Sequence, residues 1–235
     1  MIPIRDHLPG RTTPVVVFLI ILVNVLVFLY ESSLPQPRLE GFVESFGMIP
    51  YEITRSEDIP PAGPRPLYAT LITSMFMHGG WVHLIGNMLY LWIFGNNVED
   101  VFGRVGFLIF YLLVGLAGHV GQILISPASQ IPLIGASGAI AGVMGAYLVF
   151  FPRARIDTVV FLFYFIRFVP LPAVAVLGFW ILIQFLQGAA ALGPGALQGG
   201  VAWWAHIGGF AAGFASGLLF RGRAAEVSRD FRSNW

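Results

Sequence analysis

One serine lies in a run of very small residues that could support nucleophilic chemistry. The run is residues 134–142, Ile-Gly-Ala-Ser-Gly-Ala-Ile-Ala-Gly, and its serine opens an apolar segment that extends from Ser137 to Phe151. Two interpretations compete. Gly138 and Gly142, four residues apart, are typical of membrane helices that pack closely together. Alternatively, Ser137 is a nucleophile whose small neighbours let a substrate backbone approach its hydroxyl.

A histidine at the same expected depth in another apolar segment favours the nucleophile. His206 lies 15 residues before Arg221, and Ser137 lies 16 residues before Arg153. Two parallel helices would therefore bring an imidazole beside a hydroxyl, whose proton the imidazole could accept. Glycine-lined faces on the two segments predict that the helices pack closely, through residues 138, 142 and 145 on one and residues 209, 213 and 217 on the other.

A second polar pair could supply hydrogen-bond donors for an oxyanion. His83 and Asn87 are four residues apart and so share one helix face, and Asn87 lies 17 residues before Arg104. Hydrogen bonding between helices would explain this pair equally well if it stood alone. His119, beside Gln122, is interpreted as structural. Because no carboxylate lies inside a predicted span, the sequence predicts a Ser–His dyad without a third member.

The composition indicates the environment in which these side chains must work. Only 11% of the residues are charged, 57% are hydrophobic, and the mean hydropathy is +0.78. A soluble domain has about 25% charged residues, so we expect an integral membrane protein in contact with the lipid bilayer. All 13 basic residues are arginines, which excludes a Ser–Lys dyad, and the absence of cysteine excludes thiolate chemistry. The net charge of +1 argues against a nucleic-acid partner.

Hydropathy predicts an all-α, polytopic membrane protein, a bundle of six transmembrane helices. The predicted spans are residues 14–30, 81–96, 105–125, 137–151, 171–188 and 201–220. They form one domain, residues 14–220, between an N-terminal segment, residues 1–13, and a C-terminal tail, residues 221–235. The first loop is long, residues 31–80, and its apolar stretch 68–77 is expected to lie at the membrane surface or to dip into it. Residues 153–169 are expected to form an interfacial segment, and Thr13 to cap the first helix.

Arginine positions predict the orientation of these spans. Six spans place both termini on one side, which then holds ten arginines against three on the other. Because cytoplasmic loops are enriched in basic residues, we expect both termini to be cytoplasmic. The expected location is the inner membrane of a bacterium.

Three motifs together resemble the rhomboid family of intramembrane serine proteases. They are HGGWVHLIGNM at residues 78–88, GASG at residues 135–138 and AHIGGFAAG at residues 205–213, and Glu99 after the second span also fits. GASG alone is weakly specific, whereas all three motifs in this order are highly specific. The resemblance covers roughly residues 12–220.

The resemblance implies a role for each motif residue. Ser137 would be the nucleophile and His206 the general base. Asn87, His83 and the Ser137 amide would be oxyanion donors, and Gly135 would belong to the substrate-binding motif. The substrates would be transmembrane proteins, cleaved near the outer ends of their spans, and neither a cofactor nor a metal is expected.

Two features depart from the family pattern. Many relatives carry a Trp-Arg pair in the first loop, but residues 31–66 contain none, so something else must anchor this loop. Some relatives carry an aromatic residue one turn after the serine, which stacks on the histidine. Here that position is Ala141, so another residue must orient His206.

Two other functions remain as alternatives. One is a rhomboid-like membrane scaffold without proteolytic activity, although such relatives usually lose the serine or the histidine. The other is a small transporter, which would need a coupling carboxylate or an inverted repeat. For a protease, we expect the fifth span and the segment 68–77 to be the mobile parts, with substrate entering past one of them. Pro170 and Pro172 on one side of the fifth span and a Gly/Ala loop at 189–200 on the other suit a hinged element. Trimming Phe179, Trp180 or Phe185 in the fifth span to alanine is then expected to preserve or raise activity.

Overall fold

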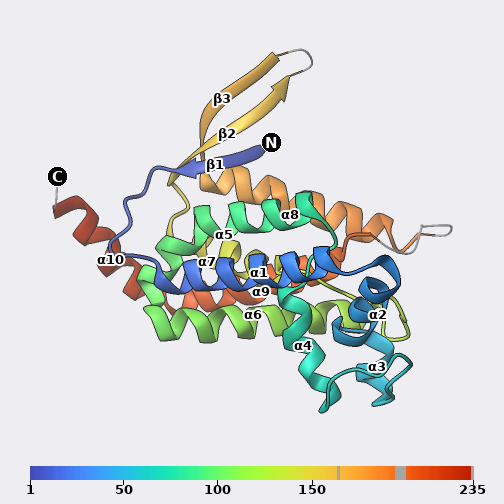
Figure 1. Cartoon of the computed structure of the whole chain (residues 1–235). Helices are drawn as coiled ribbons and strands as arrows, with labels where there is room; N and C mark the ends of the chain where they lie inside the picture. Colours follow the sequence, from blue (N-terminus) through green and yellow to red (C-terminus); the bar gives the residue numbers. More distant parts are fainter. Residues whose placement is uncertain (163–164, 194–199, 234–235) are drawn as a thin grey trace.

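The computed structural model describes residues 1–162, 165–193 and 200–233 (Figure 1). Half of the predicted Gly/Ala loop at 189–200, residues 194–199, lies outside these ranges. The helices are α1 (Val15–Ser33), α2 (Gln36–Phe46), α3 (Pro50–Arg55), η1 (Leu67–Ala69), α4 (Thr70–Thr73), η2 (Ser74–Phe76), α5 (Trp81–Phe102), α6 (Arg104–Ile125), α7 (Ser137–Phe150), α8 (Ala173–Ala190), α9 (Trp203–Leu219) and α10 (Arg221–Ser233). The strands are β1 (Ile2–Asp6), β2 (Arg155–Leu162) and β3 (Phe165–Pro172).

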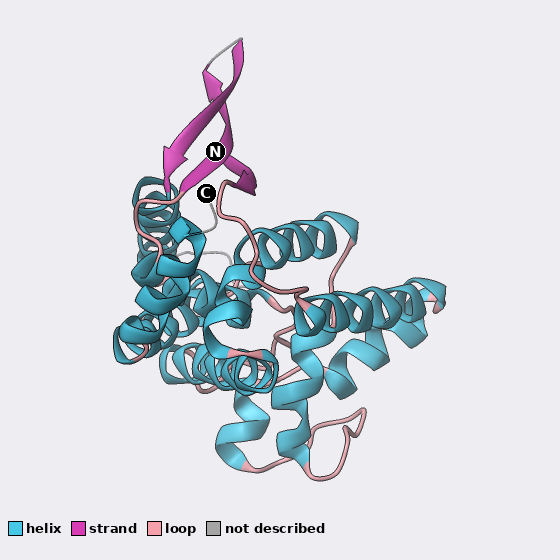
Figure 2. Ribbon diagram, turned by 90° about the vertical axis from the view of Figure 1, so that its left-hand side faces the viewer, coloured by secondary structure: helices cyan, strands magenta, loops and turns pink. Residues whose placement is uncertain are grey.

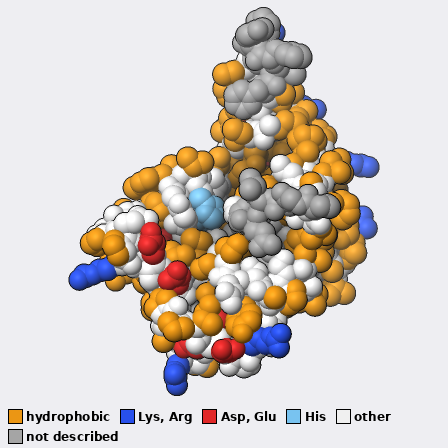
Figure 3. Space-filling view, turned by 90° about the vertical axis from the view of Figure 1, so that its right-hand side faces the viewer, with side chains coloured by type: hydrophobic (Ala, Val, Ile, Leu, Met, Phe, Trp, Pro, Cys, Tyr) orange, Lys and Arg blue, Asp and Glu red, His pale blue; other side chains and the backbone are white. Residues whose placement is uncertain are grey.

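The chain is a mostly helical, multi-pass membrane protein. Among the described residues, three helices are long and apolar enough to cross a bilayer, namely α1, α6 and α8. Helix α7 has 14 residues, about 21 Å at 1.5 Å per residue against a hydrocarbon core of about 30 Å. Hydrophobic side chains cover much of the face shown in Figure 3, and only a few charged side chains interrupt them.

Glycines bring α7, α9 and α6 into backbone contact at the centre of the bundle. A Cβ added to Gly213 of α9 would lie 2.6 Å from the Cα of Gly142 on α7, and one added to Gly209 would collide with the Gly138 carbonyl. A Cβ added to Gly118 of α6 would lie 2.8 Å from the Ala205 carbonyl oxygen. Real Cβ atoms do not approach backbone this closely, so these positions require glycine. The predicted close packing of the two glycine faces is confirmed.

A small antiparallel sheet stands beside the bundle and corrects the all-α expectation. Its order is β1-β2-β3, and β1 pairs with β2 between residues about 150 positions apart, such as Ile2 with Val159. The segment expected to lie along the membrane interface is therefore a hairpin, which projects away from the helices (Figure 2). Alternate residues Ile156 and Thr158 are fully buried, which is the two-residue periodicity of a strand.

The N-terminal strand is also bonded to α7. The Tyr147 hydroxyl donates a hydrogen bond of 2.9 Å to Asp6 Oδ2. Burial raises the pKa of Asp6 from 3.8 to about 6, although the Tyr147 hydrogen bond opposes this rise. Residues 1–13, expected only as an N-terminal segment before the first span, thus hold a strand that contacts both the hairpin and the bundle.

The N-terminus of helix α1 is capped by a side chain of α5 and not by the residue that precedes the helix. Pro14 precedes the helix and no side-chain cap bond is made there, so the expected Thr13 cap is wrong. Instead, Glu99 accepts hydrogen bonds from the amides of Val16 and Val17, at 3.1 and 2.9 Å. An acidic side chain at a helix N-terminus satisfies amides that have no partner within the helix and also complements the helix dipole.

Backbone pairing anchors the long first loop in place of a Trp-Arg pair. Met48 and Leu133 exchange two backbone hydrogen bonds, of 3.0 and 2.8 Å. The Tyr51 amide bonds to the Ser129 carbonyl, and the Thr54 hydroxyl bonds to the Pro127 carbonyl. The loop that contains α2 and α3 is therefore fastened to residues 127–133, which lead directly to the start of α7 (Figure 1).

Candidate active site

The structure brings Ser137 of α7 and His206 of α9 together where these two helices pack against each other. His206 Nε2 lies 2.8 Å from Ser137 Oγ, which is hydrogen-bonding distance. His206 is 8% exposed, whereas Ser137 is only partly buried. Ser137 is the first residue of α7, where backbone amides have no carbonyl within the helix to bond. A hydroxyl bonded to an imidazole beside free amides is an arrangement suited to acyl transfer.

Gly135 allows a second imidazole to approach the serine. A Cβ added to Gly135 would lie 2.9 Å from His83 Nε2 and 3.7 Å from Ser137 Oγ. The Gly79 amide donates to His83 Nδ1 over a long 3.4 Å. Because this bond uses the Nδ1 lone pair, it favours the tautomer that carries its proton on Nε2, the nitrogen that faces Gly135. His83 can therefore donate a hydrogen bond beside the hydroxyl.

Asn87 lies one turn after His83 on α5. It is 8% exposed, and its Nδ2 atom is buried without a hydrogen-bond partner among the described residues. Buried amide groups normally find partners, so this one is available to an incoming acceptor. No hydrogen bond connects Asn87 to Ser137 or His206 within the described part of the chain.

The two other buried histidines, His78 and His119, contact neighbours of this cluster. His78 is buried, and its ring meets that of His83 edge to face, with 5.0 Å between ring centroids. The His78 amide donates to the carboxylate of Glu31, at 3.1 Å. His119 lies 3.4 Å from the Ser74 hydroxyl and lines a cavity of about 10 Å³ beside Ser137.

Two side chains of α8 that the sequence did not indicate surround His206. Gln184 Oε1 lies 2.6 Å from His206 Nδ1, and the Trp180 ring centroid lies 5.7 Å from that of the imidazole. They are four residues apart, so they share one face of α8. The only sequence signal for Gln184 was its amide side chain inside an apolar span. Burying such a group in a membrane costs free energy unless it has a hydrogen-bond partner.

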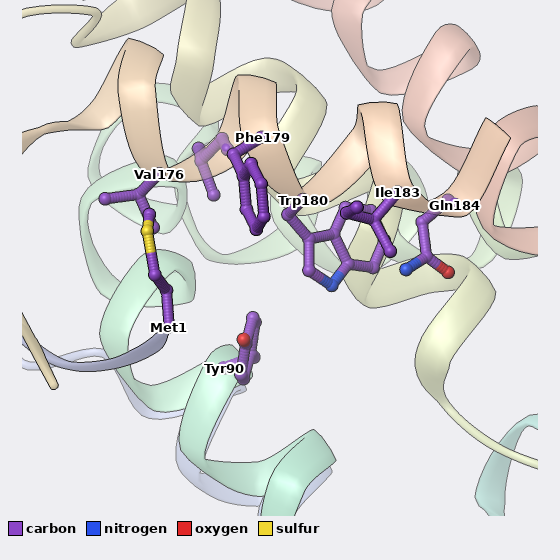
Figure 4. A pocket seen from close by; sticks show the side chains of 8 residues that line it. Met1, Tyr90, Val176, Phe179, Trp180, Ile183 and Gln184 are labelled. Carbon is purple, nitrogen blue, oxygen red and sulfur yellow. The ribbon is translucent and has the colours of Figure 1, made fainter. Parts of the chain in front are cut away.

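A second cavity opens between α8 and α5. Its volume is about 170 Å³, and its lining includes Tyr90 of α5 together with Phe179, Trp180 and Gln184 of α8. Figure 4 shows Trp180 and Gln184 projecting from α8 into the space across from Tyr90. This cavity adjoins the side chains that hold His206. Within the described residues, no group of three His, Asp or Glu side chains could hold a metal ion.

Fold and site together define a helical integral membrane protein with a serine–histidine pair at the start of a short central helix. The chain belongs to the rhomboid family, because the model of the Rhomboid domain matches residues 66–223. It is 31% identical to Rhomboid protein 1, mitochondrial, of Saccharomyces cerevisiae over 169 residues, which are 69% of this chain and 44% of that protein. It is 30% identical to RHOMBOID-like protein 4 of Arabidopsis thaliana over 220 residues, 85% of this chain and 50% of that protein.

A shorter match comes from a bacterium. Rhomboid protease GluP of Bacillus subtilis is 42% identical over 78 residues, which are 33% of this chain and 15% of that protein. The chain therefore spans half or less of the length of these curated relatives.

Proposed function

We propose that the protein is an intramembrane serine endopeptidase that hydrolyses peptide bonds in or near transmembrane segments of other membrane proteins. Ser137 is the nucleophile and His206 the general base. The observation that carries the proposal is the 2.8 Å separation of Ser137 Oγ and His206 Nε2 in a chain of the rhomboid family. The Bacillus relative is named as a rhomboid protease, which accords with this proposal.

The chemistry follows from the positions of the donors and acceptors. His206 Nε2 takes the proton as Ser137 Oγ attacks the peptide carbonyl carbon, and the C–O double bond opens to an oxyanion. His83, the buried Asn87 amide and the Ser137 backbone amide donate to that oxygen. The imidazolium then protonates the leaving amine, the C–N bond breaks, and water hydrolyses the acyl-enzyme with His206 again as base.

We further propose six membrane spans, with both termini in the cytoplasm of a bacterial cell. The chain segments assigned to the cytoplasmic side contact one another. Asp100 accepts hydrogen bonds from the backbone at Arg11 and Thr12, and β1 pairs with β2. The arginines on this side outnumber those on the other ten to three. Because the chain has no cysteine, Glu40→Cys and Gly222→Cys should be modified by a membrane-impermeant maleimide from opposite sides. Labelling of both from one side would exclude this orientation.

Labelling by a fluorophosphonate tests the enzyme itself. Purified protein should react covalently at Ser137 and cleave a transmembrane substrate, and Ser137→Ala should do neither while unfolding like the wild type. Ser216→Ala is the matched control, because Ser216 lies on α9 and its hydroxyl bonds only to the Ala212 carbonyl among the described residues. A folded wild-type protein that neither labels nor cleaves would favour the scaffold or transporter alternative, and cleavage by Ser137→Ala would place the nucleophile elsewhere.

A further inference from the structure

His206 makes its second hydrogen bond to a neutral amide on a different helix. Gln184 is 6% exposed and its Oε1 lies 2.6 Å from His206 Nδ1. An amide oxygen only accepts hydrogen bonds, so the proton between the two atoms must belong to Nδ1. A neutral imidazole has one proton, and placing it on Nδ1 leaves Nε2 with a free lone pair. That lone pair faces Ser137 Oγ at 2.8 Å and can accept its proton.

The residue at position 141 explains why His206 needs its contact with Gln184. An aromatic ring one turn after the serine could hold the imidazole from α7, but this chain has Ala141, which is fully buried. The Trp180 ring lies 5.7 Å from the imidazole, inclined by 38°, and Trp203 meets it edge to face at 6.3 Å. Neither tryptophan contact selects between the two nitrogens. Gln184 alone among the described residues bonds to Nδ1, so it alone can fix the tautomer.

We propose that Gln184 is a positioning residue for the general base: through His206 Nδ1 it holds the imidazole in the tautomer that can deprotonate Ser137. The inference rests on the proposed function and adds to it. In serine proteases with a triad, a carboxylate performs this task and also stabilises the imidazolium. An amide oxygen gives the orientation without the charge. Because Gln184 belongs to α8, while the reacting residues belong to α7 and α9, the base is correctly held only while α8 is packed against α9.

Two substitutions separate positioning from a merely structural role. Gln184→Leu removes the acceptor at similar volume and should lower kcat about 10- to 100-fold with little change in KM, since one neutral hydrogen bond and the tautomer preference are lost. Gln184→Glu keeps an acceptor oxygen and adds charge, so activity should persist and the acid limb of the kcat/KM profile should move to higher pH. The matched control is Gln187→Leu, because Gln187 lies on the same helix with an exposed side chain.

A direct measurement of the tautomer does not depend on catalysis. Long-range ¹H–¹⁵N spectra distinguish the protonated nitrogen of each histidine, and the His206 signal is assigned by its loss in His206→Asn. The wild type and Gln187→Leu should carry the His206 proton on Nδ1, whereas Gln184→Leu should give a mixture or the Nε2 form.

The outcomes distinguish this inference from the proposed function. If the wild type neither labels with fluorophosphonate nor cleaves substrate, the proposed function is wrong, but the spectra still decide the tautomer. If the wild type is active and Gln184→Leu matches Gln187→Leu in kcat and tautomer, Gln184 does not position the base. An unchanged pH profile in Gln184→Glu, with activity reduced only in proportion to folded protein, would likewise overturn the inference.

Discussion

Gly213→Ala should separate the two helices that carry the reacting side chains. The added Cβ would lie 2.6 Å from the Cα of Gly142 and closer still to its carbonyl oxygen. Carbon atoms prefer separations of about 3.5–4.0 Å, so α7 and α9 must move apart by about 1 Å. Overpacking typically costs about 1–3 kcal/mol, and we expect about 3 kcal/mol, because the obstructing atoms are backbone and cannot rotate away.

This displacement of α9 from α7 should lower the cleavage rate by a larger factor than it lowers the folded fraction. A misplacement of about 1 Å at a reacting group can cost about 10²-fold in rate, and the residual folded enzyme should show a loss of that order. Unfolding is measured by titration with SDS and followed by circular dichroism, and activity by cleavage of a transmembrane substrate.

Gly178→Ala is the matched control for this substitution. Gly178 lies inside α8, and a Cβ there would meet no atom within 4 Å. Alanine is favoured over glycine in a helix by about 1 kcal/mol, so this variant should be as stable as the wild type or more so. If Gly213→Ala unfolds at the same SDS fraction as Gly178→Ala and cleaves at the wild-type rate, the close approach of α7 and α9 is not what holds the site.

Other expected results concern the oxyanion donor Asn87, the N-terminal strand, the start of α1 and the cavity between α5 and α8. Asn87→Ala should lower kcat by about 10²–10³-fold with KM nearly unchanged, because an oxyanion donor acts mainly in the transition state; a change in KM alone would assign Asn87 to substrate binding. Burial raises the pKa of Asp6 to about 6, so the folded state should lose up to about 2 kcal/mol as pH rises from 4 to 7, and Asp6→Asn should abolish that slope in thermal unfolding. Glu99→Gln should destabilise the protein by about 1 kcal/mol in the SDS titration, through weaker capping of α1. Tyr90→Cys and Phe179→Cys, joined by a bifunctional thiol cross-linker across the cavity that they line, should slow cleavage of a transmembrane substrate but not fluorophosphonate labelling, and equal cleavage rates before and after cross-linking would mean that substrate does not enter between α5 and α8.

The sequence predicted those parts of the fold whose signal is local. Glycines four residues apart mark a helix face wherever they occur, so the contact between α7 and α9 followed from Gly142 and Gly213. Family membership followed from contiguous motifs, and the model match confirms it. The roles of Ser137, His206, His83 and Asn87 stay predictions, although the distances around Ser137 suit them.

The parts that were missed depend on partners distant in sequence. Strand β1 is five residues long and is stable only because β2 lies beside it, and no pattern within residues 1–13 indicates that pairing. Capping of α1 by Glu99 likewise joins residues more than 80 positions apart. Gln184 could be recognised as an isolated amide in an apolar helix, but its contact with His206 depends on how α8 is rotated about its axis.

The rotation of α8 also corrects the expectation about trimming its large side chains. Phe179 and Phe185 are about half exposed, whereas Trp180 lies against His206. Alanine at Phe179 or Phe185 should therefore leave activity intact, as expected from the sequence. Trp180→Ala removes a ring that packs on the base and should lower activity.

Backbone hydrogen bonds at the base of the hairpin hold the N-terminal end of α8, so the helix can tilt about that end. The Ala173 and Val174 amides bond to the Ala154 and Pro152 carbonyls, at 2.8 and 3.1 Å, so the first turn of α8 is tied to the chain just after α7. Gln184 lies 11 residues beyond Ala173, or about 16 Å along the axis at 1.5 Å per residue. A tilt of about 10° about the tied end would carry Gln184 about 3 Å, which breaks its bond to His206. On the proposed function, an outward movement of α8 that admits a substrate would therefore separate Gln184 from His206. The helix would then have to return before His206 could act as the base.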